Sequence, residues 1–327
     1  MMKSIIRQLA IHNRILLASH TRPDGDAIGA LLSMGLALEK KGCQITLYNE
    51  SSIPAVYRFL PSVHRIREQL PAAAEFDAAV ILDCGNLERV GAASAVISRI
   101  PVIINIDHHT TNDHFGHYNL VDESACATSE IIFRLVRAME VEIDPMMATA
   151  IYTGILTDTG SFRFPNTNRA AFSICEAMVA AGVQPFVVAQ HVYGTSSMGR
   201  IRLLNLALDS IEVSHDGHLS IMTVTQDMLK DTGTRPEDTD GLINYARWIQ
   251  DVEVAVLIRE LKNKATKPEH SHFHVSLRSN GDVDVARIAV SFGGGGHAGA
   301  AGFSIESELS ALKAVIYHFS DHFVEKP

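Results

Sequence analysis

Clusters of aspartate and histidine stand at the ends of apolar runs in this chain, where their side chains could bind metal ions. The clearest cluster is Asp107-His108-His109, which closes the apolar run that begins at Val102. Three similar clusters contain His20 with Asp24 and Asp26, Asp83, and Asp158. In an α/β sheet, ligand sites form outside the carboxyl ends of the strands. The clusters therefore predict one polynuclear metal site assembled from distant segments.

The mixture of carboxylate oxygens and imidazole nitrogens indicates which cations such a site would take. It suits Mn²⁺, with Mg²⁺, Co²⁺ or Fe²⁺ as alternatives. Asp24 and Asp26 are two residues apart, so in an extended loop their side chains could point toward different ions. Cys84 follows Asp83 directly, but we do not expect a thiolate ligand, because hard carboxylate sites favour other metals.

Most of these residues also have an ordinary structural interpretation. Asp26 could cap the helix that follows it, with Asp24 as a turn residue. Asp83 could cap the next helix, and Asp158 could accept hydrogen bonds from nearby threonine or serine. By contrast, two adjacent imidazoles after a carboxylate rarely have a packing role. The triplet Asp107-His108-His109 is therefore the strongest local indication of metal chemistry.

A second kind of motif lies near the end of the chain. Four consecutive glycines precede His297 and are followed by small residues; they are Gly293, Gly294, Gly295 and Gly296. Consecutive glycines can expose backbone N–H groups that converge on an anion. A flexible linker would be richer in serine and more polar. Arg278, just upstream, is a candidate second phosphate contact.

Length and charge bound the class of protein. The chain has 327 residues, which is long for one core and favours two domains. Its formal net charge is −9, whereas a general nucleic-acid binder is usually basic. This balance argues against binding of long duplexes. It favours small anionic substrates held by a few local positive groups and by metal ions.

Cysteine use and hydropathy predict a cytoplasmic protein. The four cysteines, Cys43, Cys84, Cys126 and Cys175, form no CxxC pair and no disulfide framework, which is typical of free thiols in a reducing compartment. No apolar run approaches the length that crosses a bilayer. Arg7, His12 and Arg14 interrupt the first apolar residues, so we expect no signal peptide there and no membrane partner.

The first half of the chain alternates apolar strands with helical patterns. The predicted strands are Arg14–Ser19, Gln44–Tyr48, Ala78–Asp83 and Val102–Asp107, and the predicted helices between them are Ala27–Lys41 and Leu87–Ser98. This alternation predicts an α/β fold with a doubly wound, mainly parallel sheet and helices on both faces. Helical patterns then follow at Ser129–Met139, Pro145–Thr157, Asn168–Ala181, Pro185–Val192 and Ser197–Leu208.

From about Ile211 the pattern changes to short strands. The predicted strands are Ile211–Ser214, Leu219–Thr223, Val252–Arg259 and His272–Leu277, with helices at Gly241–Trp248 and Asp284–Ser291 and an exposed loop at Lys262–His270. We therefore expect a smaller C-terminal α/β domain. The predicted boundaries are residues 1–190 for the first domain, 191–210 for a helical linker and 211–327 for the second domain.

The motifs in this order resemble those of the DHH phosphoesterases, a family named for the triplet seen here at Asp107. The segment from His20 to Asp26, Asp83 and Asp158 look like the other metal motifs of that family. Arg278 with the Gly-Gly-Gly-Gly-His segment is similar to its associated C-terminal domain. The segments Thr157–Phe164 and Gly241–Tyr245 resemble the nanoRNase and pAp-phosphatase branch. The resemblance covers nearly the whole chain.

The resemblance implies a role for each residue of the metal motifs. His20 and Asp24 would bind one divalent cation, and Asp83 would bridge to a second. Asp26, His108 and Asp158 would complete the second site. Asp83, Asp107 and His109 would take part in catalysis. Asp107 would orient an imidazole, and His109 would face the scissile phosphate as a charge stabiliser or general acid. Arg278, Gly293, Gly294, Gly295, Gly296 and His297 would hold the terminal phosphate or nucleotide of the substrate.

The resemblance also implies the reaction. The active site would lie in the cleft between a catalytic metal-binding domain and a substrate-binding domain. It would degrade short oligoribonucleotides to mononucleotides and remove the 3′-phosphate from adenosine 3′,5′-bisphosphate. Cyclic or linear dinucleotides, inorganic pyrophosphate and polyphosphate are alternative substrates, and a nucleotide-binding regulator without turnover is a further alternative. The sequence leaves the choice among them, and a homodimer, open.

Overall fold

The computed structural model describes residues 1–70, 75–262, 270–281 and 283–323, so most of the loop predicted at Lys262–His270 lies outside the described residues. The chain divides between Thr195 and Ser196 into two compact units. Helix α8 (Met198–Asp209) covers much of the segment that we expected to link two domains. It belongs to the second unit, because Leu203 and Ala207 are buried in the core of that unit.

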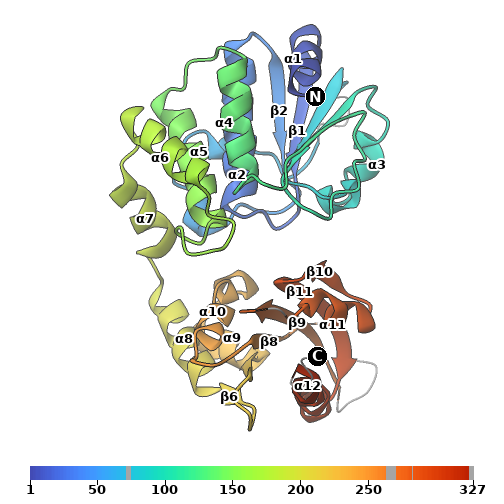
Figure 1. Ribbon diagram of the computed structural model, residues 1–327, viewed down its shortest axis with the longest axis vertical. Coiled ribbons are helices and arrows are strands. Elements are labelled where there is room, and N and C mark those ends of the chain that lie inside the picture. Colours follow the sequence, from blue (N-terminus) through green and yellow to red (C-terminus); the bar gives the residue numbers. More distant parts are fainter. Residues whose placement is uncertain (71–74, 263–269, 282, 324–327) are drawn as a thin grey trace. The chain divides into compact units, whose positions relative to one another are not determined.

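The first unit is built on a five-stranded sheet in which all neighbouring strands are parallel. Its strands are β1 (Arg14–Ser19), β2 (Gln44–Tyr48), β3 (Ala78–Leu82), β4 (Ile103–Asp107) and β5 (Tyr118–Val121). They lie in the order β2-β1-β3-β4-β5, and Figure 1 shows β2 beside β1. The direction of winding reverses between β1 and β3, and in such sheets sites form at the carboxyl ends of those strands.

Helices and short 3-10 turns precede, connect and follow these strands. The helices of the first unit are α1 (Met2–Ile11), α2 (Gly25–Lys40), α3 (Ser94–Ile97), α4 (Thr128–Ala138), α5 (Pro145–Asp158), α6 (Arg169–Ala180) and α7 (Pro185–Tyr193), and the 3-10 turns are η1 (Ala55–Tyr57), η2 (Val63–Arg65) and η3 (Leu87–Val90).

Both faces of this sheet are covered, as a doubly wound sheet requires. Along β1, Ile15 and Leu17 pack in one core with α2, α4 and α5. The alternate residues Leu16 and Ala18 pack on the opposite face, in a core that includes Val90 and Ile97. Strands buried on both faces are typical of parallel sheets. The predicted α/β fold with a mainly parallel, doubly wound sheet is therefore confirmed.

One prediction about this unit was wrong, and one strand was not predicted. The helix expected over Leu87–Ser98 is a 3-10 turn, η3, and a separate short helix, α3, because the chain turns at Gly91, where φ is +91°. Strand β5 was not predicted. Its residues are only partly buried, as expected for an edge strand, so it lacks the continuous apolar run that marks β3 and β4.

Helices α2 and α5 pack closely because small residues face each other at their contact. A Cβ added at Gly29 of α2 would lie 2.5 Å from the carbonyl oxygen of Ala150. A Cβ added at Gly154 of α5 would lie 2.8 Å from Oδ1 of Asp26. Real Cβ atoms do not approach other heavy atoms so closely. Glycine at position 29 thus allows α2 to approach α5, and glycine at position 154 leaves room for the carboxylate of Asp26 and the side chain of Ser129.

The helices are too short to indicate a membrane span. No single helix among the described residues is long and apolar enough to cross a bilayer. Helices α6 and α7 meet that criterion only together, as a pair bent by 113°. In α6, moreover, the apolar residues Ala171, Ile174 and Met178 are buried in the core of the first unit.

The second unit contains a mixed six-stranded sheet in the order β10-β11-β9-β8-β7-β6. Its strands are β6 (Glu212–Val213), β7 (Leu219–Val224), β8 (Val254–Glu260), β9 (Ser271–Ser279), β10 (Gly295–His297) and β11 (Ala300–Ser307), its helices are α8, α9 (Gln226–Thr232), α10 (Ile243–Arg247), α11 (Val285–Ser291) and α12 (Leu309–Phe323), and its 3-10 turn is η4 (Pro236–Thr239). The predicted smaller α/β domain is confirmed, although α9 and α12 were not predicted.

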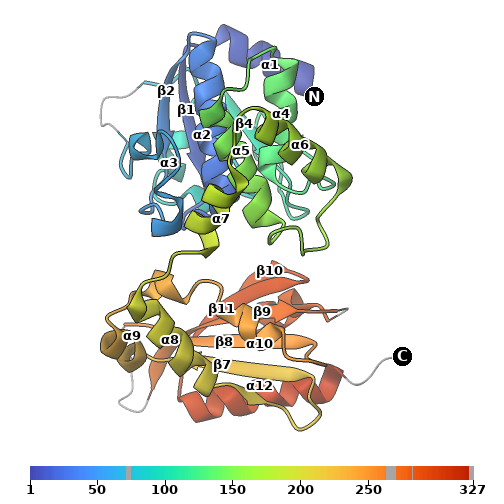
Figure 2. The same ribbon diagram turned by 90° about the vertical axis from the view of Figure 1, so that its left-hand side faces the viewer.

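Helices cover the two faces of the second sheet unequally (Figure 2). One face packs against α11 and α12 through Phe273, Val275 and Leu277 of β9. On the other face, α8, α9 and α10 pack over Met222 of β7 and Leu257 of β8. The side chains of β9 that point to this second face are only partly buried. This face therefore carries polar side chains beyond the edge of α10.

Replacing Gly29 with alanine should push α2 away from α5. Because the new Cβ would meet a backbone oxygen that cannot move alone, we expect Gly29→Ala to lower the free energy of unfolding by about 1–3 kcal/mol. Chemical denaturation measures the change. Gly281→Ala is the matched control, since nothing lies within 4 Å of its added Cβ. Equal stability of the two variants would contradict this account of the α2–α5 contact.

Candidate metal centre

All the residues predicted as metal ligands come together in the first unit. Together with His109, which was predicted to face the phosphate, they form three groups, and within each group the candidate ligand atoms lie within 4.8 Å of one another. The groups are His20, Asp24 and Asp83; Asp83, His108 and His109; and Asp26, His108 and Asp158. Asp83 belongs to the first two groups and His108 to the last two. The four sequence clusters therefore make one continuous centre.

Asp83 lies between the outer groups, with one oxygen toward each. Its Oδ2 is 3.3 Å from Nε2 of His20, and its Oδ1 is 3.7 Å from Nε2 of His108. The residue follows β3 directly and has a φ of +56°, a left-handed conformation that aspartate tolerates better than most residues. The alternative that Asp83 caps the helix at Leu87 is wrong, since Asn86 caps that turn.

Backbone carbonyls set the orientation of two imidazoles. Nδ1 of His20 lies 2.9 Å from the carbonyl oxygen of Thr21, and Nδ1 of His108 lies 3.3 Å from that of Ala125. A carbonyl oxygen only accepts, so each Nδ1 carries the proton. In a neutral ring this leaves the lone pair on Nε2, which faces the aspartates. Metal-binding histidines are commonly oriented in this way.

Asp107 lies beside the centre and holds His109. Its Oδ1 accepts from the backbone N–H of His108 at 2.9 Å and from Nδ1 of His109 at 2.7 Å. Its Oδ2 accepts from Nδ2 of Asn112 at 2.6 Å. The residue is fully buried and belongs to none of the three groups. The structure thus places Asp107 as a partner of His109, and it adds Asn112, which sequence reasoning missed.

Asp26 connects α2 to the first turn of α4. Its two oxygens accept from the backbone N–H groups of Thr128 and Ser129, at 2.6 and 2.9 Å. A helix N-terminus stabilises such a carboxylate. The hydroxyl of Thr128 also donates to Oδ1 of Asp83 at 2.9 Å. The only indication of these contacts in the sequence is the small polar pair Thr128 and Ser129, at the point where a helix was predicted to begin.

Asp24 and Asp158 complete the outer groups. The alternative that Asp26 caps α2 is wrong, because Oδ1 of Asp24 accepts from the backbone N–H groups of Asp26 and Ala27, both at 3.0 Å. Asp158 ends α5, and its Oδ2 lies 3.6 Å from Nε2 of His108 and 3.2 Å from Nδ2 of Asn166. Asn166 is a further partner that sequence reasoning missed.

Crowding of buried carboxylates shifts the proton affinities of the centre. Burial and then the charge of Asp83 raise the pKa of Asp26 to about 7. Burial and then the charge of Asp26 raise the pKa of Asp158 well above its ordinary value. Burial favours the neutral form of His20 and of His108, but neighbouring aspartates outweigh it and raise both pKa values to about 9.

The donor set fits divalent cations. Negative charge is concentrated at buried positions, and Asp26 and Asp83 are only 1% and 2% exposed. Oxygen and imidazole nitrogen donors suit manganese and related ions. Burial raises the pKa of the Cys84 thiol, which keeps it protonated, and no cysteine belongs to the groups found among the described residues. Bound cations would relieve the repulsion that raises the pKa of Asp26.

The residues predicted to bind substrate lie in the second unit. Arg278 of β9 stands opposite Ala300 of β11, and Ala300 stands opposite His297 of β10. Arg278 and the glycine segment are thus two strands apart in one sheet. The backbone N–H groups of Gly293 and Gly294 donate to the carbonyls of Val290 and Ala289, at the end of α11. These two N–H groups therefore cap the end of α11, whereas the sequence predicted that they would bind an anion.

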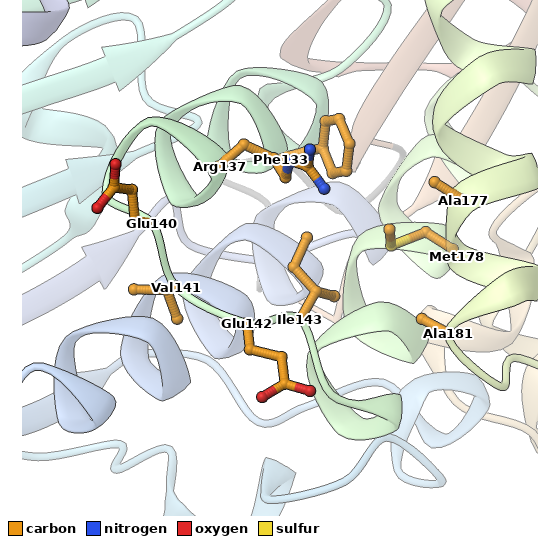
Figure 3. A pocket seen from close by; sticks show the side chains of 9 residues that line it. All are labelled: Phe133, Arg137, Glu140, Val141, Glu142, Ile143, Ala177, Met178 and Ala181. Atoms are coloured by element: carbon orange, nitrogen blue, oxygen red, sulfur yellow. The ribbon is translucent and has the colours of Figure 1, made fainter.

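A surface hollow of the first unit lies at the other end of α4 from this centre (Figure 3). Its volume is about 540 Å³, and its lining includes Phe133, Arg137, Ile143 and Met178. None of its lining residues belongs to the three aspartate and histidine groups. Thr128, by contrast, lies at the beginning of α4, beside Asp26 and Asp83. The hollow and the metal centre are therefore separate features.

Comparison with known proteins decides the family. Residues 14–155 match the model of the DHH family, N-terminal domain, and residues 219–325 match the DHHA1 domain. The chain is 33% identical over 303 residues to the bifunctional oligoribonuclease and PAP phosphatase NrnA of Thermus thermophilus. The matched residues cover 91% of this chain and 86% of that protein. The chain belongs to the DHH family. It is a metal-dependent phosphoesterase, as the sequence motifs predicted.

Further similar proteins were found in the same comparisons. The NrnA of Bacillus subtilis is 26% identical over 313 residues, covering 94% of each chain. An exopolyphosphatase-related protein from Bacteroides fragilis has a solved structure with a TM-score of 0.88 and 26% identity, covering 98% of this chain and 94% of that one. Exonuclease RecJ bound to manganese has a TM-score of 0.55 at 13% identity, which shows the shared fold alone.

Metal binding by this DHH protein should release protons at neutral pH. His20 and His108 each have a pKa of about 9, so both are protonated at pH 7 and must lose a proton to bind a cation. We expect the affinity for Mn²⁺ to rise as the pH increases from 6 to 9. Titration calorimetry in buffers of different ionisation enthalpy measures the release. An affinity that does not change over this range would contradict the prediction.

Asn112 should affect activity through Asp107. In Asn112→Ala, Oδ2 of Asp107 loses its donor, so the carboxylate can turn and His109 loses its fixed orientation. Loss of such an outer partner typically costs about 10–100-fold in activity or metal affinity, and we expect a lower kcat within that range. Asn205→Ala, which removes an exposed amide on α8, is the control. Wild-type kcat in Asn112→Ala would show that Asp107 holds its position unaided.

Proposed function

We propose that this DHH phosphoesterase degrades short oligoribonucleotides to mononucleotides and removes the 3′-phosphate from adenosine 3′,5′-bisphosphate. The position of Asp83, with one oxygen toward the His20 group and the other toward His108, is the observation that supports a centre for two cations. The similarity to NrnA proteins over nearly the whole chain supports the choice of substrates. We further propose Mn²⁺ as the cation.

The proposed ligands divide between two ions. His20 and Asp24 would hold one ion and Asp26, His108 and Asp158 the other, with Asp83 shared. When bound, a pair of divalent cations makes water a better nucleophile and stabilises charge on the attacking and leaving oxygens. The fixed partners of the ligands, such as the first turn of α4 at Asp26, keep the donors oriented, so little reorganisation is needed during the reaction.

His109 is suited to receive charge from the phosphate or to donate a proton. Burial favours its neutral form, but its hydrogen bond to Asp107 and the charge of Asp83 outweigh burial and raise its pKa. A protonated His109 donates from Nδ1 to Asp107 and can donate from Nε2 to a phosphate oxygen. We propose that His109 supplies this proton to the leaving oxygen, while Asp107 stabilises the imidazolium.

We propose that the second unit recognises the end of the substrate. Arg278 offers a guanidinium suited to phosphate, and it lies two strands from His297 in the same sheet. Gly296 tolerates no side chain, since an added Cβ would lie 2.5 Å from the carbonyl oxygen of Ala300. Residues 1–190 would then form the catalytic domain and 211–327 the substrate-binding domain. The four free cysteines support our proposal of a cytoplasmic location.

The first experiment offers the protein a labelled RNA dinucleotide and adenosine 3′,5′-bisphosphate in parallel, with Mn²⁺. We expect mononucleotide and phosphate release. Asp83→Ala should lower both rates by more than about 100-fold, since a shared ligand matters more than an outer partner. The control is Asp209→Ala, at an exposed position at the end of α8. Activity retained in Asp83→Ala would contradict the two-ion assignment.

The same assay separates the alternative substrates. Cyclic and linear dinucleotides, pyrophosphate and polyphosphate are tested beside the two main substrates. Cleavage of pyrophosphate or polyphosphate alone, lost in Asp83→Ala, would keep the metal centre and replace the proposed substrates. Binding of nucleotides without turnover in excess Mn²⁺ would indicate a regulator. Release of mononucleotides from RNA of two to five residues, with long RNA left intact, would support the proposal.

A further inference from the structure

Two large aromatic side chains stand exposed at α10 in the second unit. Tyr245 is 40% exposed and Trp248, which caps the helix, is 55% exposed. Their ring centroids lie 5.4 Å apart, with the ring planes at 63°. Ile243 and Ala246 of the same helix are buried against the sheet, so the two rings lie on the outer side. Tryptophan and tyrosine are enriched among the residues that dominate binding energies.

Two arginines lie beside this aromatic pair. Arg278 of β9 stands opposite Ala255 of β8, and directly paired residues of neighbouring strands point to the same face. Ala255 packs in the core that contains α10, so Arg278 emerges on the face that carries α10. Burial and then the charge of Arg247 lower the pKa of Arg278, and Asp240 opposes them. The charges of Arg247 and Asp240 therefore both act on Arg278. Two of these three charged groups are guanidinium groups, which suit phosphate.

Hydrogen bonds hold this region in place. Nδ2 of Asn280 donates to the carbonyl oxygens of Arg247 and Val252, at 2.6 and 3.1 Å. The amide of Asn280 thus connects the end of α10, just before Trp248, to the segment that leads into β8. Arg278 donates from its guanidinium to the carbonyl oxygen of Leu277 at 2.9 Å. A rigid aromatic surface loses little entropy when a flat ligand settles on it.

We propose that Trp248, with Tyr245 at its edge, stacks on a nucleobase of the substrate, while Arg247 and Arg278 contact a phosphate of the same nucleotide. This inference rests on the proposed nucleotide substrate and adds the part of the protein that recognises the base. Stacking accepts every base, because each has a flat π face. The subsite would therefore bind nucleotides with little base preference, and it would bind a sugar phosphate without a base less tightly.

Intrinsic fluorescence tests the stacking directly. The chain contains one tryptophan, so its emission reports on Trp248 alone. Wild-type protein is titrated with AMP, a mononucleotide that would be a product, and with ribose 5-phosphate, which lacks the base. We expect saturable quenching by AMP and none by ribose 5-phosphate. If calorimetry shows that AMP binds while the emission does not change, the base does not contact Trp248 and the proposal is wrong.

Kinetics test whether the contact serves the reaction. Loss of one stacking contact weakens binding by about tenfold, so Trp248→Ala should raise KM for the RNA dinucleotide by that factor and leave kcat unchanged. Trp248→Phe, which keeps a ring, should recover most of the affinity. Phe186→Ala is the matched control, because Phe186 is an aromatic residue of the first unit that is 76% exposed. Thermal unfolding confirms that each variant is folded.

The outcomes separate this proposal from the function on which it rests. If the wild-type protein cleaves the dinucleotide and Trp248→Ala does so with the wild-type KM, the stacking proposal is wrong and the proposed function stands. If the wild-type protein neither binds AMP nor cleaves any nucleotide, the proposed function fails and this proposal fails with it. A raised KM in Trp248→Ala, with normal kinetics in Phe186→Ala, supports the stacking subsite.

Discussion

The mutual repulsion of buried carboxylates is the constraint on which the first unit depends. Asp26, Asp83 and Asp158 converge around His108, and burial with their mutual repulsion raises the pKa of Asp26 and of Asp158. The protein offsets part of this cost with imidazoles and with the N-terminus of α4, which donates two backbone N–H groups to Asp26. Divalent cations, on which this family depends, supply the remaining positive charge. Close packing of α2 on α5 at Gly29 and Gly154 accompanies the approach of Asp26 on α2 to Asp158 on α5.

A ring of partners around the centre decides how its ligands point. Backbone carbonyls orient His20 and His108, Thr128 donates to Asp83, and Asn112 holds Asp107. The contacts of His108 and Asp83 reach segments that are distant in sequence, whereas those of His20 and Asp107 lie within their own loops. Such outer contacts commonly tune both metal affinity and rate. The centre is thus a property of the whole unit and not of four short motifs.

The second unit offers chemistry of a different kind. Its sheet is covered on one face by α11 and α12 and only partly covered on the other, where Arg278 emerges beside α10. Guanidinium groups suit phosphate, and the exposed rings of Tyr245 and Trp248 suit a base. Contacts of both kinds accept any base sequence. This tolerance matches an enzyme that would act on the ends of short RNA of any composition.

The sequence by itself determined the parallel sheet and the aspartate and histidine residues that converge in the candidate centre. Continuous apolar runs mark β1, β3 and β4 because both faces of a parallel strand are buried, and aspartate and histidine clusters at their ends identify the centre. Only the tertiary structure decided that Asp24 caps α2, that Asp26 reaches α4, and that Asn112 and Asn166 donate to Asp107 and Asp158. It also divided Leu87–Ser98 into a 3-10 turn and a short helix. Hydrophobic periodicity indicates which face of an element is buried. A hydrogen bond to a distant segment does not change the local pattern of apolar and polar residues, so that pattern cannot predict it.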